Sequence, residues 1–446
     1  MTQYSNYCIP LGMYRSVETM LHQILHPVRR CIEPVEMDAT ITKCLSALQN
    51  WIFVLLATII ISACGGRKDP QNYVLVVSFD AFRWDYHILY NTPNFDQLAK
   101  DGVKADRMIP SFPTNTFPNH YTIATGLHPD NHGLINNSFF APDLGLFYSM
   151  SDRSAVENPD FYGGEPMWVT AEKQGLKTAA FYWVGSEAPV GGMHPSYWKK
   201  YDGNVTFTAR IDSVVKWFGY PEDKRPRLIN LYFEEPDATT HEFGPVSDVT
   251  KALVENLDSL LGVLREKLAN LPNANKINLI VLSDHGIASV SPDRYINIRA
   301  VVPERMVDSF SGGNPVILVD PAEGKTDSLL VLINSVEGVK AWRKSEVPAK
   351  WRYGTHPRIP EIVVVADSSW SIGMRDRAST SRGAHGYDNY NPELYSVFYA
   401  AGPAFKKNYR LKELNNVDVY NLVCKRLNIT PAPNDGNPKV VREMLK

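Results

Sequence analysis

Three aspartates, three histidines and one threonine lie in five short polar motifs of this chain. Carboxylate oxygens and imidazole nitrogens are ligands that Zn²⁺ accepts readily, and zinc coordination turns a threonine hydroxyl into a usable nucleophile. One such residue alone is usually structural, but seven in ordered motifs predict a site that holds two metal ions. The seven residues are Asp80, Thr116, Asp237, His241, Asp284, His285 and His385.

Apolar runs of strand length precede three of these motifs, and a helical pattern separates two of the runs. Because strands and helices alternate, the sequence predicts an α/β fold with a mostly parallel central sheet flanked by helices. The aspartates then follow the carboxyl ends of strands, where open α/β sheets place their sites. The predicted strands are 73–79, 178–183, 228–233 and 277–283, and the clearest predicted helix is 249–268.

Two local features refine this prediction. Asp237 and His241 are four residues apart, so one helical turn would place both on one face. Thr116 is expected to open a helix, whose first backbone N–H groups would help to hold an anionic group. The segment 295–372 is predicted to be a small inserted α/β subdomain, with strands at 316–320 and 361–367 and a helix at 327–343.

Composition sets wider limits. The chain has 446 residues and a net charge of -2, which gives no electrostatic support for a nucleic-acid partner. Such a balance neither favours nor excludes an anionic small molecule, because bound metals supply local positive charge. We expect a monomer that acts on a small molecule.

The N-terminal region predicts export. The apolar run 51–61 is shorter than the roughly 20 residues of a membrane-spanning helix and fits the core of a signal peptide. Ile-Ser-Ala-Cys at 61–64 resembles a bacterial lipobox, so Cys64 is predicted to carry lipid, although an ordinary signal peptide or a short anchor is the alternative. We therefore expect a mis-called extension at 1–36, a lipoprotein signal peptide at 37–63 and a tether at 64–72. The mature protein would be a lipoprotein of the bacterial envelope, on its periplasmic or surface face.

After such cleavage only Cys64 and Cys424 remain of the five cysteines, so no disulfide framework is expected.

At its motifs the chain resembles the nucleotide pyrophosphatase/phosphodiesterase family of the alkaline phosphatase superfamily. The resemblance rests on Pro-Thr-Asn-Thr-Phe-Pro-Asn-His at 113–120, Thr-Gly-Leu-His-Pro at 125–129, Glu-Pro-Asp at 235–237 and His-Gly-Tyr-Asp-Asn at 385–389. It implies an alkaline phosphatase-like core and a phosphodiesterase catalytic domain over 73–446.

The resemblance also implies residue roles. Asp80, Asp284, His285 and the Thr116 oxygen would hold one zinc ion, and Asp237, His241 and His385 would hold a second. Thr116 would be the nucleophile, and Asn137 would donate to a phosphoryl oxygen. Phe117 and Tyr201 would sandwich a nucleobase in a pocket that Trp183 also lines.

The substrate stays open at this point. The leading expectation is hydrolysis of nucleotide diesters or pyrophosphates to nucleoside 5′-monophosphates through a phospho-threonine. The alternatives are a diesterase for choline or glycerol phospholipid headgroups, a phosphomonoesterase, and a lipoprotein that only binds its ligand. Asn115 and Ser138 stand where family members often carry lysine, so this chain lacks two positive charges that could neutralise phosphate. Their absence argues against a preference for polyphosphate substrates such as ATP.

Overall fold

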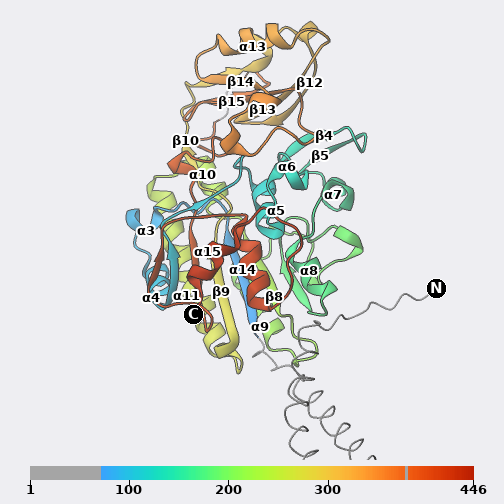
Figure 1. Cartoon of the computed structure of the whole chain (residues 1–446). Coiled ribbons are helices and arrows are strands. Elements are labelled where there is room, and N and C mark those ends of the chain that lie inside the picture. Colours follow the sequence, from blue (N-terminus) through green and yellow to red (C-terminus); the bar gives the residue numbers. More distant parts are fainter. Residues whose placement is uncertain (1–71, 377–379) are drawn as a thin grey trace, which may run out of the picture. The chain divides into compact units, whose positions relative to one another are not determined.

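An eight-stranded sheet forms the centre of the protein in a computed structural model that describes residues 72–376 and 380–446 (Figure 1). Strand β18 runs antiparallel to its neighbours β9 and β2, whereas the other pairings in this sheet are parallel. The strand order is β19 (Tyr409–Leu411), β2 (Gly102–Ala105), β18 (Phe398–Ala401), β9 (Ile277–Leu282), β1 (Tyr73–Phe79), β8 (Leu228–Phe233), β6 (Thr178–Phe181) and β7 (Tyr197–Trp198).

Strand β1 shows why the sheet lies inside the protein. All seven of its residues are buried, and they alternate between two hydrophobic clusters on opposite faces of the sheet. Val74 and Val76 belong to one cluster, and Leu75 and Val77 belong to the other. A strand covered on both faces reads as a continuous apolar run, which is the pattern that predicted it.

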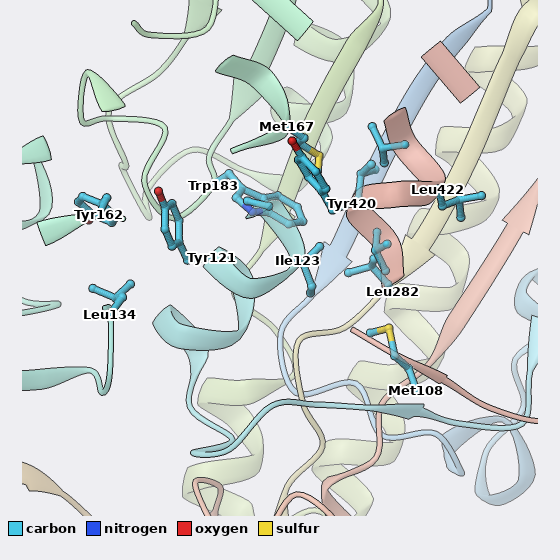
Figure 2. Packing of buried hydrophobic residues seen from close by; sticks show 14 of the residues in the cluster. Met108, Tyr121, Ile123, Leu134, Tyr162, Met167, Trp183, Leu282, Tyr420 and Leu422 are labelled. Carbon is cyan, nitrogen blue, oxygen red and sulfur yellow. The ribbon is translucent and has the colours of Figure 1, made fainter. Parts of the chain in front are cut away.

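Helices cover both faces of the central sheet. On one face, helices α5 (Thr116–Thr125), α8 (Met167–Lys173) and α14 (Asp418–Leu427) contribute Ile123, Trp168 and Leu422 to the first cluster, part of which Figure 2 shows. On the other, helices α4 (Pro93–Asp101), α9 (Phe207–Phe218) and α11 (Asp248–Ala269) pack against the sheet. Each large apolar side chain buried here contributes about 1.5–3 kcal/mol.

The segment after residue 294 holds a smaller antiparallel sheet. Its order is β12 (Val307–Gly313), β13 (Val316–Pro321), β15 (Ile362–Ala366) and β14 (Val339–Arg343), with helix α13 (Thr326–Asn334) beside it. The helix predicted over 327–343 is therefore wrong in its second half. Gly338 adopts a left-handed φ of 82°, which ends the turn after α13, and Val339 and Ala341 then pack inward as a strand.

This smaller sheet is joined to the main core by its own side chains. Val316, Leu318 and Val363 belong to the same hydrophobic cluster as the central sheet, and the Trp351 ring stacks on Phe112 with a centroid distance of 4.0 Å. Phe112 immediately precedes the Pro-Thr-Asn-Thr motif. The insert thus supports the loop that carries Thr116.

The predicted extension at 1–36, signal peptide at 37–63 and lipid-bearing Cys64 lie outside the described residues, as does the tether except for Asn72. Among the described helices, none combines the length and the apolar character that a membrane crossing requires.

Candidate active site

Three neighbouring strands of the central sheet deliver the aspartates to one edge. Asp80 directly follows β1, Asp284 and His285 follow β9, and Asp237 opens helix α10 (Asp237–Phe243) shortly after β8. The Asp80 backbone N–H donates to the carbonyl of Phe233 at 2.9 Å, which ties the ends of β1 and β8 together. The carboxyl ends of parallel strands meet here, as the sequence predicted.

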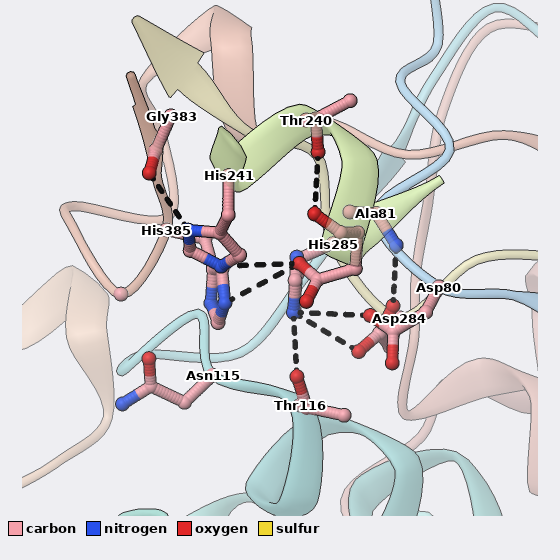
Figure 3. Close-up of polar contacts among 12 residues, drawn as sticks. Asp80, Ala81, Asn115, Thr116, Thr240, His241, Asp284, His285, Gly383 and His385 are labelled. Carbon is pink, nitrogen blue, oxygen red and sulfur yellow. Dashed lines mark hydrogen bonds and ion pairs between the residues drawn. The ribbon is translucent and has the colours of Figure 1, made fainter. Parts of the chain in front are cut away.

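His385 comes from a distant part of the chain and is positioned by a short strand pair. Strand β17 (Gly383–Ala384) pairs antiparallel with β10 (Ala288–Ser289), which begins just after His285. As a result the rings of His285 and His385 stack with a centroid distance of 3.9 Å, and His241 lies 5.0 Å from His385 (Figure 3).

Backbone carbonyls orient all three histidines in the same way. His241 Nδ1 lies 2.7 Å from the Gly383 carbonyl oxygen, His285 Nδ1 lies 2.8 Å from that of Gly286, and His385 Nδ1 lies 2.9 Å from that of Thr114. A carbonyl oxygen only accepts, so each Nδ1 carries the proton and donates it. Each Nε2 therefore keeps a lone pair that faces the carboxylates, which is the usual arrangement of a metal-binding histidine.

The spacing within the first group of donors suits a tetrahedral metal. His285 Nε2 lies 3.1 Å from Asp284 Oδ2, 3.6 Å from Asp80 Oδ1 and 3.2 Å from Thr116 Oγ1. Ligands of a tetrahedral zinc ion at its normal bond lengths are about 3.3 Å apart.

A second group of donors lies beside the first. Asp237 Oδ1 lies 3.4 Å from His241 Nε2 and 3.5 Å from His385 Nε2. These three residues form a cluster whose donor atoms are close enough to share one ion. The structure therefore brings all seven predicted donors together in two adjacent groups.

Three buried carboxylate oxygens of the cluster have no hydrogen-bond partner within the described part of the chain: Asp80 Oδ1, Asp237 Oδ1 and Asp284 Oδ2. A buried charged oxygen without a partner is costly, and a bound cation removes that cost. Each of these atoms is the oxygen that faces a histidine Nε2. The residues present therefore fit a metal pair.

The electrostatics of the cluster point the same way. Burial raises the pKa of Asp80 well above its usual value, and the neighbouring Asp284 raises it further. Burial also acts to raise the pKa of Asp237, but the neighbouring histidines, His241 first among them, together outweigh it and leave that pKa at about 2. Crowded carboxylates that repel each other's charge are the environment a divalent cation neutralises.

Thr116 is the first residue of helix α5, as predicted, but the two positions that follow it offer no free backbone N–H to an anion. The Phe117 N–H donates to Asn137 Oδ1 at 3.0 Å, and Pro118 has no N–H. Because the carbonyl end of the Asn137 amide is engaged there, its NH₂ end is the end that can still donate.

A cavity of about 320 Å³ opens beside Thr116 and Asp80. Phe117, Trp183 and Tyr201 line it, whereas Asn137 is not among its lining residues. The Trp183 indole N–H donates to the His120 carbonyl at 3.0 Å, which fixes the ring in the wall. The volume is that of a small-molecule site.

Sequence reasoning missed several residues of this site. The Tyr232 hydroxyl donates to Asp80 Oδ2 at 2.6 Å, and Tyr232 also lines the cavity. Two ion pairs, Arg153 with Glu187 and Arg210 with Glu234, each place a carboxylate in the cavity wall. Tyr232 of β8 is paired with Ser78 of β1, two residues before Asp80. This pairing could have pointed to Tyr232, but it is known only once the register of the two strands is known.

Such a sheet, with candidate metal donors at its strand ends and a hydroxyl that opens a helix, belongs to the alkaline phosphatase-like fold class. The family model described as "Type I phosphodiesterase / nucleotide pyrophosphatase" matches residues 74–388. The chain belongs to this family.

Individual relatives agree. A venom phosphodiesterase of Crotalus durissus collilineatus is 37% identical over 389 residues, covering 84% of this chain and 47% of its own length. Human ectonucleotide pyrophosphatase/phosphodiesterase family member 5 is 33% identical over 395 residues, covering 88% of this chain and 82% of its own length. The chain thus spans about half the length of the venom relatives that it matches.

Among solved structures, murine ectonucleotide pyrophosphatase/phosphodiesterase 5 superposes with a TM-score of 0.81 at 34% identity, covering 84% of this chain and all of that one. That structure is of an inactive variant, with a threonine replaced by alanine, in complex with AMP.

Proposed function

We propose that this protein is a zinc-dependent phosphodiesterase that releases nucleoside 5′-monophosphates from nucleotide diesters or pyrophosphates. The observation that carries the proposal is the position of Thr116, whose hydroxyl lies 3.2 Å from His285 Nε2 and also lines the aromatic cavity. One hydroxyl thus belongs both to the donor cluster and to the site where a substrate would bind.

Asp80, Asp284, His285 and the Thr116 oxygen would hold one zinc ion, and Asp237, His241 and His385 would hold the other. When bound, the metal pair lowers the pKa of the threonine hydroxyl and neutralises charge on the phosphoryl oxygens. Nitrogen and oxygen donors at tetrahedral spacing favour zinc over magnesium, which prefers six oxygen ligands.

The chain's own residues would then act in order. The Thr116 oxygen forms a bond to phosphorus as the bond to the leaving oxygen breaks, and the leaving group takes up a proton. The Asn137 amide donates to a phosphoryl oxygen from its free NH₂ end. A water molecule then attacks the phospho-threonine, the bond from phosphorus to Thr116 breaks, and the threonine hydroxyl regains its proton.

Phe117 and Tyr201 would hold the nucleobase between their rings, with Trp183 in the wall. This assignment is supported by their shared cavity and by the AMP complex of the murine relative. A choline headgroup fits less well. The two glutamates in the cavity wall, Glu187 and Glu234, are already paired with Arg153 and Arg210 and are not free to attract a cation.

The deciding experiment compares kcat/KM of the zinc-loaded protein for a chromogenic nucleotide 5′-phosphodiester, a phosphocholine diester and a phosphate monoester. We expect a clear preference for the nucleotide diester, and Tyr201→Ala should reduce that preference. Preference for the phosphocholine diester would reassign the cavity to lipid headgroups. Preference for the monoester would overturn the diesterase assignment.

Thr116→Ala tests the nucleophile. It should abolish turnover while bound zinc is largely retained, because three protein ligands remain at that position. Thr116→Ser keeps a hydroxyl and is the matched control that should stay measurably active. An undiminished rate in Thr116→Ala would remove Thr116 from this role.

We also propose export and lipid anchoring through Cys64. The supporting observation is the small-residue sequence Ser-Ala-Cys that directly follows the apolar run. Cys64→Ala should move the protein from the membrane fraction to the soluble fraction of an expressing bacterium, and intact mass should locate the mature start. A mature chain that retains residues before Cys64 would disprove the cleavage.

A further inference from the structure

A second cavity, of about 460 Å³, lies between the segment that follows helix α5 and the inserted subdomain. It shares no lining residue with the cavity beside Thr116. On one side it is lined by His128, Asp130 and Asn131, and on the other by Lys344, Arg352 and Thr355 among others.

The one carboxylate in this lining is already used by the backbone. Asp130 Oδ1 accepts the N–H groups of Gly354 at 3.0 Å, Thr355 at 2.8 Å and His356 at 2.9 Å. Asp130 Oδ2 accepts the Thr355 hydroxyl at 2.5 Å. Asp130 therefore fixes the loop of the insert and forms no ion pair with a cation of the cavity.

The two cations of the lining, Lys344 and Arg352, have no carboxylate partner among the described residues. Lys344 Nζ donates one hydrogen bond, to the Ile359 carbonyl at 3.0 Å, which leaves two of its three N–H groups. Neighbouring cations in the insert differ, because Arg343 pairs with Asp327 and Lys350 pairs with Asp388. Lys344 and Arg352 thus outnumber Asp130, which is the one carboxylate of this lining, and neither is engaged in an ion pair among the described residues.

The backbone segments that carry these two cations lie in close contact. A Cβ atom on Gly354 would lie 2.1 Å from the carbonyl oxygen of Lys344, so the two segments cross in contact and only glycine fits. Arg352 itself has a left-handed φ of 49°, a conformation that costs a non-glycine residue free energy. Strain at a cationic residue beside a cavity is a reason to look for a ligand there.

We propose that this cavity binds a phosphate-type anion, either inorganic phosphate or a phosphate monoester, between Lys344 and Arg352. The planar guanidinium donates two parallel hydrogen bonds to phosphate oxygens, and the ammonium adds a point charge. A doubly charged anion matches two unpaired cations. The proposal is independent of the reaction proposed for Thr116.

Calorimetric titration of the full-length chain tests the proposal. Chelator treatment first removes metal ions, so that an anion cannot bind through them, and inorganic phosphate and AMP are the two probes. We expect saturable binding of one phosphate per chain. The double variant Lys344→Gln/Arg352→Gln should bind at least tenfold more weakly. If AMP binds more tightly than phosphate and this difference is lost in the same variant, the ligand is an ester rather than the free ion.

Two controls make a negative result informative. Lys325→Gln/Lys340→Gln removes the same charge from exposed positions of the insert and should leave phosphate affinity unchanged. Arg352→Gln alone covers the case in which loss of the Lys344 hydrogen bond disturbs folding, because the Arg352 side chain makes no polar contact with another described residue. The metal-loaded Lys344→Gln/Arg352→Gln variant should keep its kcat/KM for the nucleotide diester within twofold of the wild-type value. Equal affinity in wild type and in both cavity variants, or no saturable uptake by wild type at millimolar phosphate, would overturn the proposal.

Discussion

At the scale of single residues, the two oxygens of Asp80 have different surroundings. Oδ2 accepts a hydrogen bond of 2.6 Å from the Tyr232 hydroxyl, whereas Oδ1 has no hydrogen-bond partner and faces His285 Nε2. A carboxylate held by one oxygen presents the other in a single direction. Tyr232 thus acts on a bound metal through Asp80, as outer groups do at metal sites in general.

The change Tyr232→Phe removes only that hydroxyl. We expect metal affinity to fall by about 10- to 100-fold, because Asp80 loses its fixed orientation. Competition with a chromogenic chelator measures this affinity, and excess zinc should rescue kcat. Tyr353→Phe is the control, since its buried hydroxyl donates to the Ile135 carbonyl. Unchanged metal affinity in Tyr232→Phe would show that Asp80 needs no such support.

His132 gives stability a dependence on pH. Its pKa is lowered from 6.5 to about 3 because burial penalises the charged ring. The folded state therefore binds a proton less readily than the unfolded chain, so this histidine makes no proton-linked contribution well above pH 6.5 and destabilises the fold as the pH falls from 6.5 toward 3. Between pH 7 and pH 5 we expect it to cost about 2 kcal/mol of stability.

Urea unfolding at the two pH values checks this expectation. His132→Gln should be less stable at pH 7, because it loses the contacts with Thr122 and Leu134, yet lose less stability on acidification than wild type. An equal loss in both proteins would mean that other groups set the acid sensitivity.

The residue types of the donor cluster could be predicted from sequence, because Asp, His and Thr carry their chemistry wherever they stand. The roles of Tyr232, Arg153 and Glu187 could not. Each depends on which way a side chain points from its strand or helix and on a partner far away in the chain. That information exists only once register and packing are known.

At the scale of elements, the turn after β9 holds His285 by a close approach of two backbones. The Gly286 carbonyl accepts the His285 Nδ1 proton, and a Cβ on Gly286 would lie 2.4 Å from the carbonyl oxygen of Glu393. A side chain at this position would push the turn away and rotate the imidazole with it.

Gly286→Ala should therefore lower metal affinity and kcat/KM together, each by about tenfold or more. Gly313→Ala is the matched control, because a Cβ at Gly313 meets no atom within 4 Å. Zinc content and steady-state kinetics of both variants provide the measurement. If Gly286→Ala has the zinc content and kcat/KM of the wild type, the turn accommodates the added methyl group without moving His285.

Elements buried on both faces were the predictable ones, since their apolar runs are continuous. Strand β8 has the predicted bounds, and α11 extends the predicted helix by one residue at each end. The helix predicted over 327–343 was wrong beyond α13, because an apolar stretch of that length fits a helix or a strand equally well and the turn at Gly338 decided between them. The antiparallel β18 was not predicted either, since direction within a sheet is a tertiary property.

At the scale of the whole molecule, the donor cluster brings together residues that are far apart in the sequence. Its aspartates and histidines follow β1, β8, β9 and β17, and Thr116 opens helix α5. Removal of metal should leave three buried carboxylates to repel one another, so we expect a chelator to lower Tm and to abolish turnover, with zinc restoring both. Metal at about 100 times its Kd adds roughly 2.7 kcal/mol to stability.

Thermal unfolding with and without chelator measures that contribution. Asp80→Asn/Asp284→Asn lacks two of the repelling charges, and its Tm should respond less to the chelator. A wild-type Tm that is independent of metal would contradict the expectation.

The two faces of the small sheet in the insert pack against different parts of the protein. Val316 and Leu318 of β13 pack into the main core, whereas Ile317 and Val319 pack toward α13. The insert therefore cannot be exchanged between relatives as an independent unit. Substitutions on the α13 side can be compensated within the insert itself, but a transplanted insert must bring a matching partner for Phe112 and the strands beneath it. Recombination that breaks this match would displace the Thr116 loop even if every metal ligand were preserved.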